Sequence, residues 1–142
     1  MNWHDIWFPL SRIGIAYLVS LPMGWESEKE HEVAGVRTFP IVAMAACGFM
    51  LAVRAIENDP AAQSRALQGL IAGIGFIGGG AILKEGATAR GTATAASIWN
   101  VGVIGAAVAM EHFEIAIVLS VLNVLTLFLL IPVKNRLSGN KN

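Results

Sequence analysis

One apolar run, residues 69–83, restricts what this chain can fold into more than any other segment. It carries no charge, is long enough to enter a bilayer, and six of its fifteen residues are glycine. In water each glycine weakens a helix by roughly 1 kcal/mol relative to alanine, whereas in a membrane it lets a second helix backbone come close. We therefore expect a transmembrane helix at the centre of the protein, turned away from lipid. Its packing faces would be built from Gly69, Gly73, Gly75, Gly78, Gly79 and Gly80.

The composition is that of a membrane protein with a single domain. Only 14% of the 142 residues are charged and 55% are hydrophobic, and the mean hydropathy is +0.61. In soluble domains about a quarter of all residues are charged. The net charge of zero argues against nucleic-acid binding. No basic region precedes the first apolar segment and no small-residue cleavage site follows it, so we expect this segment to be retained as a helix.

The apolar runs predict an all-α membrane protein with about five transmembrane helices, since a crossing needs about 20 mostly apolar residues. Asp59 is expected to cap the third helix, with Pro60 at its first position. Pro22 is expected to kink the first helix, and Ser97 and Asn100 interrupt the fourth. The expected helices cover residues 6–25, 38–56, 60–83, 94–110 and 115–133.

The distribution of lysine and arginine predicts the orientation in the membrane, because cytoplasmic loops carry an excess of both. With five crossings, seven of these residues fall on one side and only Arg12, Arg54 and Arg65 on the other. The N-terminus is therefore expected outside and the C-terminus in the cytoplasm.

An acidic segment, residues 26–32, follows the first span and contains four glutamates and His31. Carboxylate oxygens could hold a hard cation such as Mg²⁺ there. The alternative is a solvated helix end whose acids simply share a face. Beyond this open question, no cofactor is expected.

Two arginines flank later helices. Arg37, in the turn 34–38, is expected either to pair with Glu26 or Glu28 or to extend its side chain toward the interface. Arg90 lies in a segment rich in small and hydroxyl residues, 84–97, that leads into the fourth helix. Free N–H groups at that helix start, together with Arg90, could receive an anion or a partner carboxylate, or could serve ordinary capping.

Polar residues inside the spans are costly and by default suggest function. Gln68 and Asn100 are expected to make interhelical hydrogen bonds, and Arg12 is close enough to the outer interface to reach it. No arrangement typical of a catalytic triad or of a histidine ligand set is present, so an enzyme is not expected. The expected functional polar cluster comprises Glu26, Glu28, Arg37, Arg90, Thr94, Asn100 and Arg12.

At these positions the chain resembles the membrane domain of the MgtC/SapB family. That family shows Gly-Leu-Glu-Arg-Glu, Ala-Gly-Leu-Arg-Thr, Gly-Ile-Gly-Phe-Leu-Gly-Ala-Gly and Arg-Gly-Leu-Thr-Thr-Ala-Ala in this order, and its first-helix arginine matches Arg12. The sequence departs from this pattern at Ser27, where the family has arginine, and at Ala93, where it has threonine. The corresponding segments here are Gly24–Glu28, Ala34–Thr38, Gly73–Gly80 and Arg90–Ala96.

The resemblance implies a bacterial inner-membrane protein linked to growth at low magnesium and to survival inside host cells. Some members of the family restrain the membrane ATP synthase. The soluble C-terminal domain of longer members is not expected, because only residues 134–142 follow the last span.

The expected function is that of a small non-enzymatic protein that acts through intramembrane contacts with itself, as a homodimer, or with a partner membrane protein such as the ATP synthase. It would serve cation or pH homeostasis. The alternative is a small cation channel or transporter, in which the glycine-rich helix and the Arg90 loop line the path. Glycine faces serve both close packing and substrate sites in broken helices, so they do not separate the two functions.

Overall fold

The computed structural model describes residues 3–29, 34–56, 59–85 and 88–138. Within these ranges the chain forms five helices and one short β-hairpin, which confirms the expected all-α membrane fold. The elements are α1 (Trp3–Lys29), α2 (Thr38–Ile56), α3 (Pro60–Gly80), β1 (Leu83–Glu85), β2 (Thr88–Arg90), α4 (Thr92–Ala109) and α5 (Phe113–Ser138).

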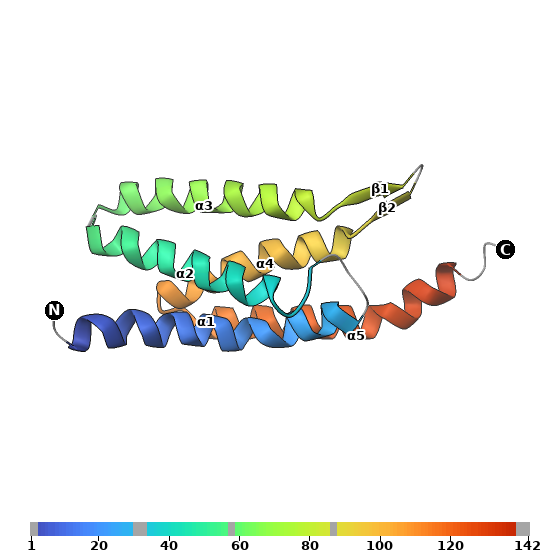
Figure 1. Cartoon of the computed structure of the whole chain (residues 1–142), viewed down its shortest axis with the longest axis horizontal. Coiled ribbons are helices and arrows are strands. Elements are labelled where there is room, and N and C mark those ends of the chain that lie inside the picture. Colours follow the sequence, from blue (N-terminus) through green and yellow to red (C-terminus); the bar gives the residue numbers. More distant parts are fainter. Residues whose placement is uncertain (1–2, 30–33, 57–58, 86–87, 139–142) are drawn as a thin grey trace.

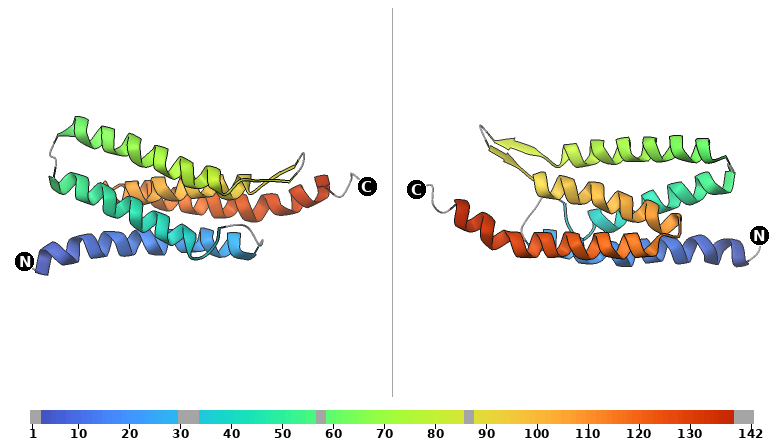
Figure 2. Two further views of the ribbon diagram at one scale, coloured as in Figure 1. Left: turned by 45° about the horizontal axis from the view of Figure 1, so that its top comes forward. Right: turned by 180° about the vertical axis from the view of Figure 1, so that it is seen from behind.

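The helices lie side by side and alternate in direction, so the two termini are at opposite ends of an elongated bundle (Figure 1). The N end, as we call it, holds the start of α1 and the connections α2–α3 and α4–α5. The C end holds the connection α1–α2, the β-hairpin and the end of α5. Both views in Figure 2 show the same alternation.

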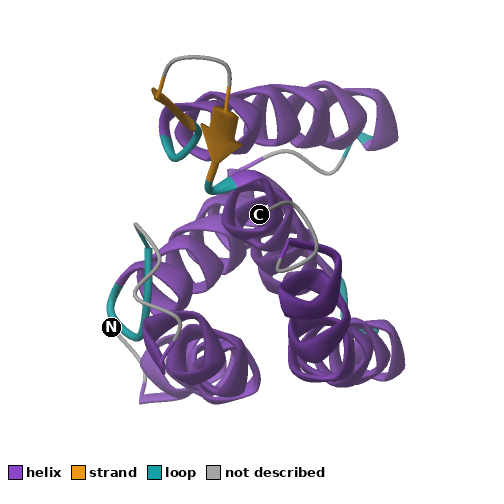
Figure 3. Cartoon of the chain, turned by 90° about the vertical axis from the view of Figure 1, so that its right-hand side faces the viewer, coloured by secondary structure: helices purple, strands orange, loops and turns teal. Residues whose placement is uncertain are grey.

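The centre of the bundle is α4, which contacts all four other helices and has 12 of its 18 residues buried. Most of its buried residues are Ala, Gly, Ser or Thr, whose small side chains let neighbouring backbones come close. The expectation that the glycine-rich segment is the centre is therefore wrong for the single chain. α3 lies at the edge, at the top of Figures 1 and 3, and only Ile74 and Gly78 within it are buried.

Several expected boundaries agree with the structure. α2 covers the expected range, and α3 begins at Pro60, where the Asp59 carboxylate accepts a hydrogen bond from the Ala61 N–H at 3.0 Å. α1 is longer than expected at both ends and continues as helix through Pro9 and Pro22. α4 and α5 each begin two residues earlier than expected, and α5 extends to Ser138.

The expected third helix is too long by three residues, because a β-hairpin replaces its end and the loop that follows. Leu83 pairs with Arg90, and Glu85 pairs with Thr88, in an antiparallel register. Gly91 then starts α4 with φ of +80°, a conformation that costs a side chain 1–2 kcal/mol. A Cβ at this position would also collide with the Ala81 carbonyl, so the hairpin base closes only around glycine.

Within the described residues, four helices are long and apolar enough to cross a membrane: α1, α2, α4 and α5. α3, expected as a fifth crossing, is not one of them, since Gln63, Arg65 and Gln68 dilute its apolar residues. On α1, Trp7 and Trp25 are 62% and 64% exposed, and about 1.5 Å per residue places them roughly 27 Å apart. Tryptophan favours the two interfaces of a bilayer whose hydrocarbon core is about 30 Å thick.

Candidate functional site

The end of α4 carries the most developed polar site that the structure describes, at the N end of the bundle. The Glu111 N–H donates to the Val108 carbonyl at 3.2 Å, and the His112 N–H donates to the Ala107 carbonyl at 2.9 Å. This pair of bonds is the Schellman motif, whose left-handed position is usually glycine. Here that position is Glu111, with φ of +68°. A strained residue other than glycine suggests that its side chain has a task.

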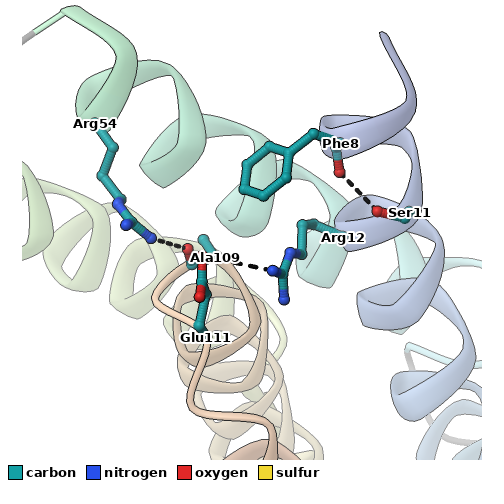
Figure 4. A network of polar contacts seen from close by, with 6 residues as sticks. All are labelled: Phe8, Ser11, Arg12, Arg54, Ala109 and Glu111. Atoms are coloured by element: carbon teal, nitrogen blue, oxygen red, sulfur yellow. Dashed lines mark hydrogen bonds and ion pairs between the residues drawn. The ribbon is translucent and has the colours of Figure 1, made fainter. Parts of the chain in front are cut away.

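The Glu111 side chain forms an ion pair with Arg12. An Arg12 guanidinium nitrogen lies 3.5 Å from a Glu111 carboxylate oxygen, and the guanidinium carbon lies 5.0 Å from the ring centre of Phe8 (Figure 4). The same carbon lies 4.6 Å from the ring centre of Phe113. The Arg12 side chain is only 17% exposed. Cation–π contacts strengthen when the cation is desolvated, so the two rings replace part of the water that Arg12 loses. Arg12 thus joins α1 to the α4–α5 connection at the N end, and its expected reach to the outer interface stays a prediction.

A second arginine reaches the same helix end from α2. Arg54 donates from Nη1 to the Ala109 carbonyl at 2.6 Å. The last carbonyls of a helix have no intrahelical partner and carry the negative end of its dipole, so a guanidinium there is favourable on both counts. Figure 4 shows the two arginines approaching the end of α4 from different helices. Arg12 and Arg54 therefore tie α1 and α2 to the central helix.

The strained position gives a sign test for the Arg12–Glu111 pair. In an Arg12→Met background, Glu111→Gly is expected to stabilise the protein by about 1 kcal/mol, because it removes the left-handed strain. With Arg12 present, the same change should give no gain or a loss, because it leaves a largely buried guanidinium without its carboxylate. Thermal unfolding of the four proteins in detergent measures this coupling. Equal stabilisation in both backgrounds would show that the ion pair contributes nothing.

At the C end, the structure joins the first two motifs through backbone contacts. The Glu28 carboxylate accepts from the Val36 N–H at 3.1 Å, just ahead of α2, and the Ser27 hydroxyl donates to the Ala34 carbonyl at 2.6 Å. A carboxylate at a helix N-terminus is favoured by the helix dipole. A Cβ at Gly35 would displace the Glu28 carboxylate from this position. Ser27, noted only as a departure from the family pattern, thus helps to hold the loop.

The expected polar cluster separates into three places. Glu26, Glu28, Arg37 and Arg90 come from elements that meet at the C end. Glu26 is half-buried, Arg37 and Arg90 are exposed, and Thr94 is buried in the first turn of α4. Arg12 lies at the opposite end, and Asn100 lies between the ends. The ion pair expected between these arginines and Glu26 or Glu28 stays a prediction.

Hydrogen bonds between α4 and α5 confirm the interhelical role expected for Asn100. Its side-chain amide donates to the Leu119 carbonyl at 3.3 Å, and the Ser97 hydroxyl donates to the Asn123 side-chain oxygen at 3.0 Å. The Ser120 hydroxyl donates to the Val19 carbonyl on α1 at 2.7 Å. Such bonds hold transmembrane helices together where water cannot compete. Gln68, expected to act in the same way, is exposed on α3.

The glycines of α3 behave differently from one another within the chain. Gly78 packs against α4, where an added Cβ would come within 3.0 Å of the Ala95 carbonyl oxygen. A Cβ would meet nothing within 4 Å at the other five positions. Two of them, Gly69 and Gly73, line an open groove between α3 and α2. Their contact with a second copy or a partner stays a prediction. The five open positions are Gly69, Gly73, Gly75, Gly79 and Gly80.

The question of a cation site stays open. Among the described residues, no three His, Cys, Asp or Glu side chains gather closely enough to hold a metal ion. Glu30, His31 and Glu32 lie outside the described residues. The expected magnesium site in segment 26–32 is therefore still a prediction.

Sequence reasoning missed the residues that pack the bundle most tightly. Gly105 on α4 lies against the Ala43 carbonyl and the Ala46 side chain on α2, and Gly102 lies against Ile74 on α3. The signal was available, because Gly102, Gly105 and the alanines that follow form a small-residue run like that of α3. Nothing in the sequence indicated that Arg12 and Arg54 would both reach the end of α4.

Comparison with known proteins gives a family. The model of the MgtC family matches residues 13–136. The protein MgtC of Brucella abortus is 35% identical over 120 residues, which are 80% of this chain and 50% of that protein. The protein SrpB of Synechococcus elongatus is 32% identical over 135 residues, which are 85% of this chain and 74% of SrpB.

The protein MgtC of Salmonella typhimurium is 32% identical over 107 residues, which are 75% of this chain and 46% of that protein. The chain thus spans about half the length of the MgtC proteins that it matches. No solved structure matches it.

Proposed function

This chain belongs to the MgtC family, and on that premise we propose that it is a non-enzymatic protein of a bacterial inner membrane. It acts by contacts of its membrane helices with a second copy or with a partner membrane protein, of which the ATP synthase is one candidate. The contacts serve adaptation to low magnesium or cation and pH homeostasis. The magnesium role in this proposal follows from the family name MgtC and from the resemblance described above.

The open face of α3 is the observation that carries the proposal. Four of its glycines, 69, 73, 79 and 80, leave room for another backbone, and Phe76 protrudes among them with 85% of its surface exposed. A glycine face toward lipid gains nothing, whereas the same face toward a helix allows close packing. Gln68 is exposed one residue before this series begins, and a polar side chain at membrane depth favours a hydrogen bond to a neighbouring helix.

The orientation is part of the proposal. Of the described lysines and arginines, three belong to the helix ends at the N end, namely Arg12, Arg54 and Arg65. Six belong to the segments at the C end, namely Lys29, Arg37, Lys84, Arg90, Lys134 and Arg136. The lysine and arginine bias therefore favours a cytoplasmic C end and an external N end.

A glycine substitution tests the proposal. In a bacterium that lacks its own MgtC-family protein, the wild-type chain should restore growth in low-magnesium medium, and Gly73→Leu should abolish this rescue. The leucine would block a second helix, and its Cβ would not collide with the chain itself, since nothing lies within 4 Å of that atom. Gly14→Leu on α1 is the matched control, because its surroundings are equally open.

Cross-linking identifies the protein that the open face of α3 contacts. In a Cys47→Ser background, a cysteine placed by Gly73→Cys should form a disulfide with a second copy or a cross-link to a partner such as the ATP synthase. Full rescue by Gly73→Leu, together with unchanged folded yield, would contradict the proposed contact.

A cation channel or transporter is the second candidate, and one observation favours it. A groove of about 310 Å³ between α4 and α5 is lined by Ser97, Asn100, Asn123 and Thr126, which are oxygen-bearing side chains at membrane depth. No carboxylate lines this groove, so a permeating cation would gain little from it. Purified protein in liposomes that are loaded with a cation-sensitive dye distinguishes the two functions: cation flux above that of empty liposomes supports transport.

A further inference from the structure

A groove between α1 and α2 opens at the N end of the bundle. Its volume is about 740 Å³. Most of its wall is apolar, and among the described residues Arg54 is the only charged one that lines it. Gly48 keeps the groove open, since the Ile13 side chain lies 3.7 Å from where its Cβ would be. The lining residues are Phe8, Pro9, Ile13, Gly48, Leu51, Ala52, Arg54 and Ala55.

The groove has the depth profile of a lipid. Arg54 lies in the last turn of α2, and the exposed Trp7 lies on α1 beside the groove residue Phe8. Exposed tryptophan marks the headgroup level of a bilayer. Gly48 lies six residues before Arg54, so the groove runs roughly 9 Å along α2 from the headgroup level toward the interior. Its charged end is thus at the interface, and its apolar end lies in the hydrocarbon core.

The charge at the mouth of the groove is cationic. Glu111, the carboxylate that the structure places beside the two arginines, is engaged by Arg12. Arg54 contacts a neutral carbonyl instead, and this contact uses one of the five N–H donors of its guanidinium. The remaining donors are suited to a phosphate, which arginine binds with a planar pair of hydrogen bonds.

We propose that this groove binds one phospholipid, with an acyl chain along α1 and α2 and the phosphate on Arg54. The bound chain covers apolar surface that lies between two helices, and the phosphate accepts from the Arg54 donors that the Ala109 carbonyl does not use. Anionic phospholipids bind more tightly than zwitterionic ones because their net negative charge is attracted to the Arg54 guanidinium. The proposal does not depend on the partner contact proposed for α3, which uses a different helix face.

The test compares phosphatidylglycerol with phosphatidylcholine of the same acyl chains, each added to the purified full-length chain in detergent. Native mass spectrometry counts retained lipids, and thermal unfolding reports the affinity. The wild type should retain one phosphatidylglycerol. Gly48→Leu and Ala52→Leu, which fill the groove, should remove this lipid although Arg54 is intact. Arg54→Gln should lower the affinity for phosphatidylglycerol about fivefold, and Arg54→Lys should restore most of it.

Arg65→Gln is the matched control, because Arg65 is exposed at the same end and lies 3.9 Å from Asp59, outside the groove. It should retain the lipid. The proposal is overturned if both groove-filling variants retain phosphatidylglycerol as the wild type does, or if Arg65→Gln weakens binding as much as Arg54→Gln. It is also overturned if Gly48→Leu converts a dimer into monomers without changing lipid retention, because the groove would then hold a second copy. If Arg54→Gln does not fold, the two groove-filling variants decide whether the proposal holds.

Discussion

Gly105→Leu is expected to remove most of the folded protein. Gly105 lies where α4 crosses α2, and an added Cβ would collide with the Ala43 carbonyl and press on the Ala46 side chain. Overpacking a filled site costs typically 1–3 kcal/mol. Here the cost should reach or exceed the upper end, about 3 kcal/mol, because a backbone atom cannot change rotamer to make room. The two helices would have to move apart, and α4 is the helix that all the others contact.

Fluorescence-detected size exclusion of detergent extracts measures the outcome as the fraction of monodisperse protein. The matched control is Gly14→Leu, the same substitution on α1 at a position where nothing lies within 4 Å. It should leave the monodisperse fraction unchanged. Equal tolerance of the two leucines would contradict the α2–α4 crossing described above.

Glu26→Arg is expected to inactivate the protein and lower its folded yield, with partial rescue by a second reversal. Glu26 is half-buried at the end of α1, and Arg37 and Arg90 come from elements that reach the same end. A pair between this half-buried carboxylate and an exposed arginine should cost more to break than the roughly 0–1 kcal/mol of a surface pair, but less than the about 3–5 kcal/mol of a buried one. Adding Arg37→Glu or Arg90→Glu should restore part of the folded yield, and the arginine that does so is the partner of Glu26.

Growth in low-magnesium medium and folded yield are both measured for each variant. Glu114→Arg serves as control, because Glu114 is exposed at the other end and its neighbour at 3.3 Å is His112. If Glu26→Arg is folded, stable and active, the acidic segment is a solvated helix end and the arginines bind lipid headgroups.

The parts of the fold that could be predicted from the sequence are those with local causes. The range of α2 follows from one continuous apolar run, and the start of α3 follows from the Asp59–Pro60 pair, whose capping bond depends on adjacent residues only. The hairpin could not be predicted in this way, because it depends on a contact between two helices. Gly91 adopts its positive φ where the end of α3 meets the start of α4, and sequence periodicity does not report that meeting.

The centre of the bundle could not be assigned from composition alone. α3 and α4 are both rich in glycine and alanine, so small residues identify two candidate centres. The choice depends on which helix is surrounded, and the charged and amide residues Arg65 and Gln68 on α3 were the signal that favoured α4. The Arg12 site could not be predicted from the sequence either, because Glu111 and Phe113 are distant from Arg12 along the chain.

The marginal apolarity of α3 affects how the protein is made. During synthesis a helix passes from the translocation channel into lipid according to its own hydropathy, and α3 falls short of the level that the other four helices reach. Its inward face, Ile74 and Gly78, is covered mainly by α4, which the ribosome delivers later. α3 is therefore expected to stay in the translocation channel until α4 has been synthesised. The two helices, joined by the hairpin, would then enter the bilayer together. The last half of the chain thus decides the placement of the third helix.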